Sequence, residues 1–347
     1  MQRNQLGFSL VELMISITLG LFLMTGVVQM FLGSKQTFSS QQAVSRVQET
    51  GRLAIEFISR DIRMAAYYGC FSPKNGVSKQ VDVVPNNLSI GGLHGRFDEG
   101  VMGYENAAAL PNGVDGDGVA PDLGATIKPI ANTNILVLRG ADSQVLVGSA
   151  ANAATAVFAR TTAPLVDGCV QGICENSVVV VSDCAKARIF QVSAEPTVVV
   201  DTLTLQHTDA WGGNSLNFET YFDKLSEIAL MKTVVYFVAE GNGADKGPSL
   251  YQRVNNEPPV ELVEDVENVR FTYGINGTDY RNAVNMLAPD WAQVTAVRIE
   301  LLVRSDKDNV VEDNQPYTFA GNNVVQADVA DKRIRKVFMA TVGVRSR

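Results

Sequence analysis

The sequence predicts an α+β protein in which a long N-terminal helix packs on an antiparallel β-sheet head. The first observation is an apolar run over residues 8–32, followed by helical periodicity with no proline before Pro73. The second is a series of β-branched runs, separated by turn residues, from residue 133 onwards. This order of elements favours a helix layered on one face of an antiparallel sheet.

The composition bounds the class of protein. The chain has 347 residues, of which 46% are hydrophobic, and this suffices for a substantial core. The formal net charge of −8 argues against nucleic acid as the main partner, because phosphate binding requires a basic surface. All four cysteines follow the apolar run, so two disulfides are expected in an oxidising compartment. Their spacings match no common zinc finger.

The apolar run is long enough to cross a membrane as a helix, since about 20 apolar residues suffice. It differs from a secretory signal, because no small-residue cleavage site follows it. The residues before Phe8 carry a single basic side chain, Arg3, and Glu12 and Gln29 are the only strongly polar residues within the run. We therefore expect the apolar run to remain in the mature protein.

The polar residues after Gly33 do not end the predicted helix. Residues at alternating steps of three and four form an amphipathic face: Val44, Val47, Gly51, Ile55, Ile58, Ile62 and Ala65. We expect one helix over residues 9–67, built from a membrane half (8–33) and an amphipathic half (34–70). Glycines at 20, 26, 33 and 51 interrupt it, and both bending and close packing explain them.

The remainder, residues 71–347, is predicted to form the head. Its first part, 72–131, has the composition of loops, because Gly, Asn, Asp and Pro are frequent there. A hairpin loop is predicted between the runs that end at 240 and begin at 249. The predicted strands are 133–141, 176–184, 187–193, 197–205, 230–240, 249–255, 266–275, 293–305 and 335–347.

The residues in front of the apolar run form a specific motif. Gly7 and Phe8 are followed by Glu12, four residues after Phe8. This pattern, directly before an apolar run, resembles the type IV prepilin cleavage motif. The resemblance implies that prepilin peptidase cuts between Gly7 and Phe8, removes the leader 1–7 and methylates the new amine of Phe8.

Glu12 is costly in a bilayer, on the order of 3 kcal/mol at its centre, so its presence needs a reason. Phe8 and Glu12 are neighbours on one helical face, and an α-amine titrates near about 7.7–8.0, so the two groups can pair. The resemblance implies that Glu12 pairs with the amine of a neighbouring subunit during docking. The alternative is a plain anchor with Glu12 among the lipid headgroups.

Two further segments narrow the resemblance to the PilW-type minor pilins. The C-terminal segment 335–347 is similar to the closing strand of that family, and 45–70 is similar to its helix. Ala66 and Ser346 depart from the pattern, and 72–131 lies outside the resemblance. The J-type minor pseudopilins of type II secretion are the nearest alternative. The helix residues that carry the resemblance are Gln48, Gly51, Arg52, Asp61, Arg63, Ala65, Gly69 and Cys70.

The resemblance implies a non-enzymatic minor pilin with a pilin-like fold. Its implied role is to prime pilus assembly in a minor-pilin complex at or near the tip, supporting adhesion and twitching motility. Implied partners are prepilin peptidase, other minor pilins, the major pilin, a tip adhesin and inner-membrane lipid. The implied location is the inner membrane, with one pass and a periplasmic head, and later the pilus on the cell surface. No cofactor or small-molecule substrate is implied, and a head that itself acts as the adhesin through 72–131 is an alternative.

The cysteine pairing stays open at this stage. Cys70 ends the helix and Cys184 ends a predicted strand, so a bond between them would tie helix to sheet. The chain-entropy model gives such a long loop up to about 4.7 kcal/mol. Cys169 and Cys174 would then close a short local loop. Pairing of Cys70 with Cys169 or Cys174 is the alternative.

The sequence makes no case for catalysis, since it has no nucleophile elbow, P-loop or zinc-protease motif. His94 and His207 occur in unrelated contexts, and each is expected at the surface. A weak calcium candidate comprises Asp115, Asp117 and Asp122, although the segment fails the EF-hand pattern. The basic segment 332–336 is interpreted as a charged sheet edge, with DNA contact as the alternative.

Overall fold

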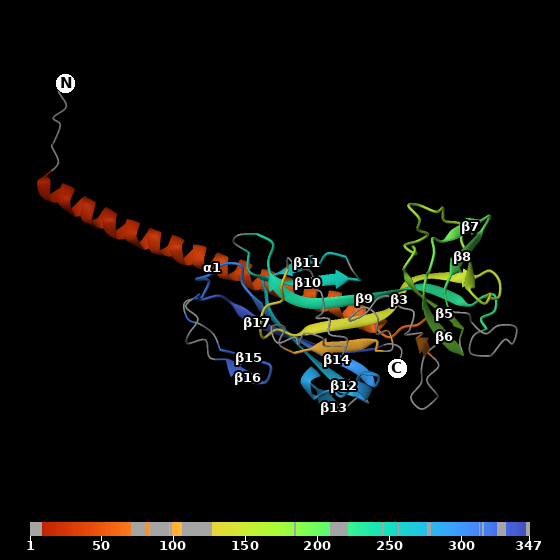
Figure 1. The fold of residues 1–347 in the computed structure, drawn as a ribbon. Helices are drawn as coiled ribbons and strands as arrows, with labels where there is room; N and C mark the ends of the chain where they lie inside the picture. Colours follow the sequence, from red (N-terminus) through yellow and green to blue (C-terminus); the bar gives the residue numbers. More distant parts are fainter. Residues whose placement is uncertain are drawn as a thin grey trace, which may run out of the picture.

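The fold combines one long helix with a head of β-sheets, which confirms the predicted α+β class (Figure 1). The structure is a computed structural model of the chain. The residues that it describes are 9–70, 81–83, 97, 99–105, 127–183, 185–208, 221–243, 246–255, 257–275, 279–311, 313, 316–324 and 331–344.

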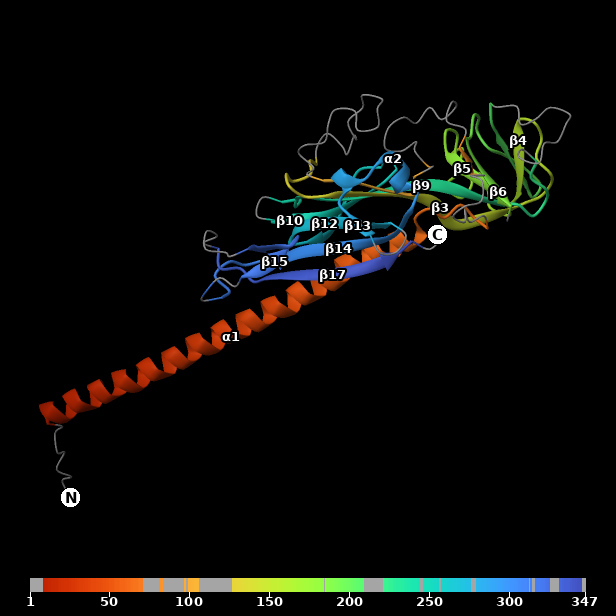
Figure 2. The same cartoon turned by 90° about the horizontal axis from the view of Figure 1, so that it is seen from below.

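Helix α1 spans Leu10–Met64 and has 55 residues, which corresponds to about 82 Å at 1.5 Å per residue. Its first half projects away from the head, and its second half lies along the head (Figure 2). The helix ends three residues before the predicted residue 67. The reason is the backbone, because Ala65 is extended and Ala66 has a left-handed φ of 58°.

The largest sheet has eleven strands in the order β1-β6-β5-β9-β3-β4-β8-β7, with β2 paired to β3 and β10 joining β9 to β11. Its pairs are antiparallel except β1 with β6. The strands are β1 (Val81–Val83), β2 (Val101–Tyr104), β3 (Ile135–Gly148), β4 (Ala156–Arg160), β5 (Val178–Asp183), β6 (Lys186–Gln191), β7 (Thr197–Val199), β8 (Thr202–Gln206), β9 (Glu227–Glu240), β10 (Pro248–Val254) and β11 (Val260–Glu264).

A second sheet has four antiparallel strands in the order β13-β12-β14-β17. Strands β14 and β17 pair without a register shift from Ala296↔Gly343 to Arg304↔Arg335. The hairpin of β15 and β16 forms a separate sheet. These strands are β12 (Val266–Ile275), β13 (Asp279–Arg281), β14 (Val294–Arg304), β15 (Tyr317–Phe319), β16 (Asn322–Val324) and β17 (Arg335–Gly343), with the short helices η3 (Ala283–Asn285) and α2 (Ala288–Trp291) after β13.

Each predicted strand segment overlaps an observed strand, although β3 and β9 are longer than predicted, and the predicted hairpin joins β9 to β10. The run 197–205 is not one strand, because a turn with a left-handed Val200 (φ 60°) folds it into β7 and β8. The expectation of loops at 72–131 is wrong for β1 and for β2, which is buried along its whole length. β2 contains Gly103, and a glycine in so short a run weakens the strand pattern in the sequence. The glycine is needed there because an added Cβ would overlap Tyr273. The prediction also missed the short strands β4, β11, β13, β15 and β16.

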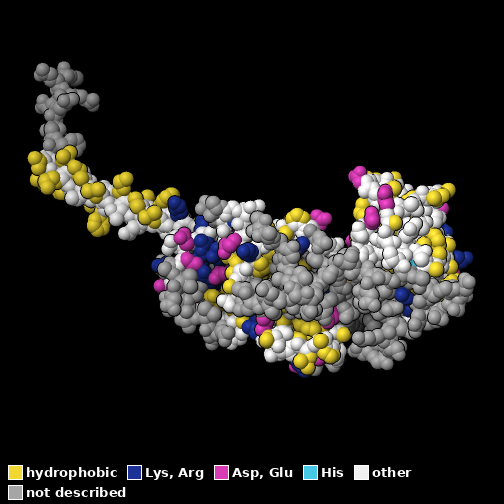
Figure 3. Space-filling model, in the orientation of Figure 1, with side chains coloured by type: hydrophobic (Ala, Val, Ile, Leu, Met, Phe, Trp, Pro, Cys, Tyr) yellow, Lys and Arg dark blue, Asp and Glu magenta, His cyan; other side chains and the backbone are white. Residues whose placement is uncertain are grey.

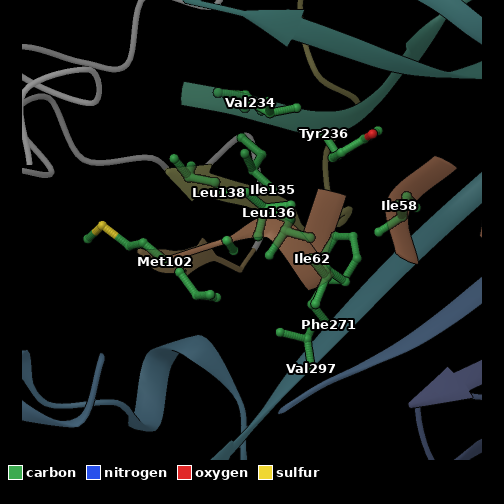
Figure 4. Packing of buried hydrophobic residues seen from close by; sticks show 14 of the residues in the cluster. Ile58, Ile62, Met102, Ile135, Leu136, Leu138, Val234, Tyr236, Phe271 and Val297 are labelled. Carbon is green, nitrogen blue, oxygen red and sulfur yellow. The ribbon is translucent and has the colours of Figure 1, made fainter. Parts of the chain in front are cut away.

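The head has two hydrophobic cores. The larger core lies between α1 and the two main sheets, where Ile62 of α1 meets Leu136 and Phe271 (Figure 4). The smaller core includes Val157, Leu203 and Phe222 and belongs to the strands β4 to β8 and the ends of β3 and β9. We call the part of the head around the smaller core the distal lobe. It lies at the end of the molecule opposite the N-terminus (Figure 1).

The amphipathic face of α1 is confirmed in part. Five of its seven predicted members are buried: Val47, Gly51, Ile58, Ile62 and Ala65. Val44 is 40% exposed and Ile55 is half-buried, whereas Ala43, Ala54 and Ser59 are buried instead. The buried face is therefore rotated slightly from the predicted one, since α1 packs on two sheets at once.

Candidate functional site: the apolar helix and its seat on the head

The N-terminal half of α1 is an apolar rod, and among the described residues its first hydrogen bond to the head is made by Gln36. Its most apolar window has a mean hydropathy of 2.0 and is 0% buried within the molecule. Figure 3 shows the hydrophobic side chains along this projecting segment. By length and composition, α1 is the one helix among the described residues that is suited to cross a membrane.

Hydroxyl side chains within the apolar rod bond to the helix itself. Ser16 Oγ donates to the carbonyl of Glu12 at 2.8 Å, and Thr25 Oγ1 donates to the carbonyl of Leu21 at 2.8 Å. Thr18 Oγ1 donates to the carbonyls of Met14 and Ile15. Polar groups satisfied in this way suit a lipid environment, where water is absent.

Glu12 lies in the first turn of α1 and is exposed. A carboxylate is favourable there because the helix dipole places partial positive charge at the N-terminus. Gly7 and Phe8, the expected cleavage and methylation residues, lie outside the described residues. Their geometry relative to Glu12 is therefore not part of the structure.

The apolar rod meets the head at a loop that follows β14. Ser40 Oγ donates to the carbonyl of Val310 at 2.8 Å, and Gln36 Nε2 donates to the same carbonyl at 3.1 Å. Arg46 forms an ion pair with Asp306 in the same loop. Charged side chains gather where α1 enters the head (Figure 3). These contacts define where the free rod ends.

Asp61 ties the helix to the large sheet. The hydroxyl of Tyr236 in β9 donates to Asp61 Oδ2 at 2.7 Å, and Gln252 Nε2 in β10 donates to the same oxygen at 2.9 Å. Gln252 Nε2 also lies 2.8 Å from the Tyr236 hydroxyl. Burial, and then the negative charge of Asp61, raise the pKa of Tyr236 well above its ordinary value, so the hydroxyl stays a donor.

Sequence reasoning selected Asp61 from the family pattern but did not identify its partners. Tyr236 and Gln252 lie in strands 175 and 191 residues further along the chain. No local signal marks such a pair. The one sequence feature that could have indicated these partners is the position of the Asp61 carboxylate on the helix face that packs on the large sheet.

Of the four helix glycines, Gly51 has a clear packing role. A Cβ at Gly51 would lie 2.3 Å from the ring of Phe338 in β17, so the close approach of helix and strand requires the missing side chain. For Gly20, Gly26 and Gly33, no atom lies within 4 Å of an added Cβ. Close packing within the molecule therefore explains Gly51 but not the three glycines of the apolar rod.

The Gly69-Cys70 step joins the end of α1 to the large sheet. Gly69 has a φ of 83°, and an added Cβ would lie 2.1 Å from Ser182 Oγ in β5. The amide of Cys70 donates to Glu227 Oε2 at 2.5 Å. Cys70 takes part in a disulfide, whereas its expected partner, Cys184, lies outside the described residues.

Cys169 and Cys174 form a disulfide with each other, which excludes the alternative pairings of Cys70 with either residue. The bond clamps two consecutive tight turns, which have positive φ at Asp167-Gly168 and at Gln171-Gly172. Backbone bonds within Val166–Cys169 and Val170–Ile173 close these turns. Val170 and Ile173 are buried in the smaller core, so the clamp anchors a surface loop to the distal lobe.

The double variant Cys169→Ser with Cys174→Ser should lower the free energy of unfolding by about 2 kcal/mol, the chain-entropy value for so short a loop. Denaturant unfolding of the full-length protein in detergent measures this loss. The variant is preferred to a reducing agent, because the reducing agent would also break the disulfide of Cys70. Unfolding identical to wild type would mean that the packing of Val170 and Ile173 alone holds the loop.

The histidines and the calcium candidates are the remaining candidate residues from the sequence. His207 is 4% exposed and packs edge-to-face on Phe190, so its expected surface position is wrong. The cause is the alternation of β8, which ends against the smaller core. His94 and the calcium candidates Asp115, Asp117 and Asp122 lie outside the described residues. Among the residues that are described, no group of three metal-ligating side chains is present.

The basic segment 332–336 mostly bonds to the head itself. The side chain of Arg335 is 3% exposed and pairs with Asp331 and Glu267, each at 2.7 Å. Arg335 holds the pKa of Asp331 below its ordinary value. Arg333 donates to the carbonyls of Ser305 and Asp306. Because these arginine side chains already bond to the head, the contacts favour a charged sheet edge over a DNA-binding segment.

A projecting apolar helix joined to an antiparallel-sheet head is a pilin-like arrangement. Residues 235–346 match the family Type IV Pilus-assembly protein W, and residues 2–28 match the Prokaryotic N-terminal methylation motif. The two matches support a type IV pilus minor pilin of PilW type that is processed by prepilin peptidase. No curated protein and no solved structure gives a significant match.

The range matched by the pilus-assembly family, residues 235–346, corresponds to a defined part of the fold. It contains β10 to β17 and both partners of Asp61, Tyr236 and Gln252. The helix segment 45–70 and the whole distal lobe before β9 lie outside both matched ranges. The matched range therefore contains the strands on which the C-terminal half of α1 is seated.

Proposed function

We propose that this minor pilin helps to prime pilus assembly in a complex with other minor pilins and remains at or near the pilus tip. One observation carries the proposal: the distal lobe extends beyond the C-terminal end of α1 (Figure 1). Subunits that share a helical core stack along the helix direction. A head that overhangs its own helix would collide with the next subunit above it, and the tip is the place where no such subunit follows.

The proposal includes the following processing and location. The leader 1–7 is removed between Gly7 and Phe8, and Phe8 becomes the methylated N-terminus. Residues 8–33 then anchor the protein by a single pass in the inner membrane, with 34–70 and the head 71–347 in the periplasm. After assembly the apolar rod lies in the fibre core, and the pilus carries the head to the cell surface.

Deletion of the gene tests the proposal. We expect a sharp loss of surface pili and of twitching motility and adhesion, with restoration by the wild-type gene. Electron microscopy of negatively stained cells counts the fibres, and gold-labelled antibody against the head locates the protein on them. Normal fibre numbers would contradict the priming role, and label along the whole shaft would contradict the tip position.

Glu12→Ala should leave cleavage and methylation intact but reduce incorporation into sheared fibres several-fold. The helix still forms, since alanine favours it, whereas the carboxylate that would pair with a neighbouring amine is lost. The mass of the membrane-bound protein reports processing, and immunoblots of sheared fibres report incorporation. Glu49→Ala, on the exposed face of the amphipathic half, is the matched control. Equal recovery of both variants in fibres would indicate a plain anchor.

Two alternatives have distinct outcomes. A type II secretion pseudopilin would leave pili unchanged and abolish protein secretion when deleted, although the pilus family match argues against this. A head that is itself the adhesin would lose attachment on replacement of the segment 106–126 while fibre numbers stay normal. That segment lies outside the described residues, so the structure adds nothing in its favour.

A further inference from the structure

The outer edge of β17 is an unusual feature of the head. Strand β17 has nine residues and ends the four-stranded sheet. The other strands that end a sheet are shorter: β1, β7 and β13 have three residues, β2 has four, and β11 has five with glutamates at 261 and 264. Free edges invite pairing with other chains, so proteins normally shorten them or protect them with charges.

Basic residues protect only the start of the β17 edge, at 332–336, and the rest of the edge lacks these protections. Its pairing with β14 has no register shift, so no bulge disturbs it. The residues 337–343 include no charge and no proline, and Met339 is 69% exposed. The hairpin of β15 and β16 contacts β17 but forms a separate sheet. The edge is therefore long, regular and largely uncharged.

The register shows which backbone groups point outwards. The amide of Val344 donates to the carbonyl of Thr295, and the amide of Ser305 donates to that of Ile334. In an antiparallel ladder such bonded pairs recur at every second residue, so 336, 338, 340 and 342 face β14. Val337, Met339 and Thr341 then direct their amides and carbonyls away from the sheet. No described residue forms a backbone bond with these groups.

A second copy of the chain is a poor occupant for this edge. β17 runs in the same direction as α1: the carbonyl of Lys332, before the strand, bonds to Val310 beside Ser40, and Phe338 lies against Gly51. Antiparallel pairing of two β17 edges would set the two helices in opposite directions. Both apolar rods could then not enter the same membrane.

We propose that β17 receives an extended segment of a different subunit of the same pilus assembly, which adds a fifth strand to the sheet. The segment is free of proline and rich in β-branched residues, because it must bond to the groups of Val337, Met339 and Thr341 and cover Met339. It carries a carboxylate near the start of β17, where the exposed side chains of Lys332 and Lys336 are basic. This proposal rests on the proposed function, since it takes the partner from the pilus assembly.

Paired variants separate strand addition from side-chain contact. Met339→Pro removes an outward amide without touching the ladder to β14, whereas Met339→Ala shortens the side chain and keeps the amide. We expect Met339→Pro to weaken co-purification of the full-length protein with one of the co-expressed minor pilins of the same cell at least tenfold. Met339→Ala should retain it. Equal losses in both variants, or no loss in either, would overturn strand addition.

Hydrogen exchange of the wild-type protein gives an answer that does not depend on the proline variant folding. In the isolated protein in detergent, the amides of Met339 and Thr341 should exchange much faster than those of Phe338 and Ala340. In the co-purified complex they should slow at least tenfold. Unchanged exchange would refute the proposal, and protection in a complex of identical chains would refute the choice of partner. Normal pili in Met339→Pro cells, with pili lost on gene deletion, would reject strand addition and leave the proposed function standing.

Discussion

Gly69→Ala is expected to lower the free energy of unfolding by about 3 kcal/mol or more. Gly69 has a left-handed φ of 83°, and this region costs a residue with a Cβ about 1–2 kcal/mol. The added Cβ would also lie 2.1 Å from Ser182 Oγ and 2.9 Å from Glu227 Oε2. Overpacking of this kind costs about 1–3 kcal/mol, because the surrounding sheet must shift. Denaturant unfolding of the full-length protein in detergent measures the loss.

Two other glycines separate the contributions. Gly321 has a φ of 77° with no atom within 4 Å of an added Cβ, so Gly321→Ala should show the backbone cost alone. Gly26 lies in the apolar rod with equally open space, so Gly26→Ala should stabilise the helix by up to about 1 kcal/mol. If Gly69→Ala and Gly321→Ala cost the same, the overlap with Ser182 has no energetic weight.

Asp61→Ala is expected to loosen the helix from the head and to cost about 1–3 kcal/mol. The carboxylate accepts from both the Tyr236 hydroxyl and Gln252 Nε2, and hydrogen bonds to a charged group contribute about 1.5–3 kcal/mol. The Tyr236 hydroxyl keeps the carbonyl of Phe57, at 3.2 Å, as its remaining acceptor. Hydrogen exchange should show the effect first in the last turns of α1. The apolar rod should be unaffected, because among the described residues its first hydrogen bond to the head is made by Gln36.

Asp61→Asn and Tyr236→Phe form the matched set. Asparagine keeps an acceptor oxygen for the hydroxyl, so Asp61→Asn should cost less than Asp61→Ala. Tyr236→Phe removes the donor but leaves Asp61 the bond from Gln252, so it should cost less than Asp61→Ala. In the double variant Asp61→Ala with Tyr236→Phe, the loss should be smaller than the sum of the two single losses, since both changes remove the bond between Asp61 and Tyr236. Additive losses would show that Asp61 acts elsewhere.

Local patterns in the sequence determined much of this protein. The apolar run and the recurrence of small and apolar residues predicted α1, because helix formation depends on neighbours three and four residues apart. β-branched runs predicted the long strands for a similar reason. The motif of Gly7, Phe8 and Glu12 is a linear pattern, so it can be identified in the sequence without any tertiary contact. The resemblance drawn from this motif and from the C-terminal segment agrees with the two family matches, whereas the segment 45–70 lies outside both.

Only the tertiary structure decided which residues meet across the chain. Tyr236 and Gln252 converge on Asp61, Phe338 fills the space left at Gly51, and Ser182 excludes a side chain at Gly69. It also separated the head into two cores, buried His207 and left the outward groups of β17 open. Pairings between distant strands follow from the order in which strands join a sheet. That order depends on how the whole set of apolar faces packs, and no short window of sequence contains this information.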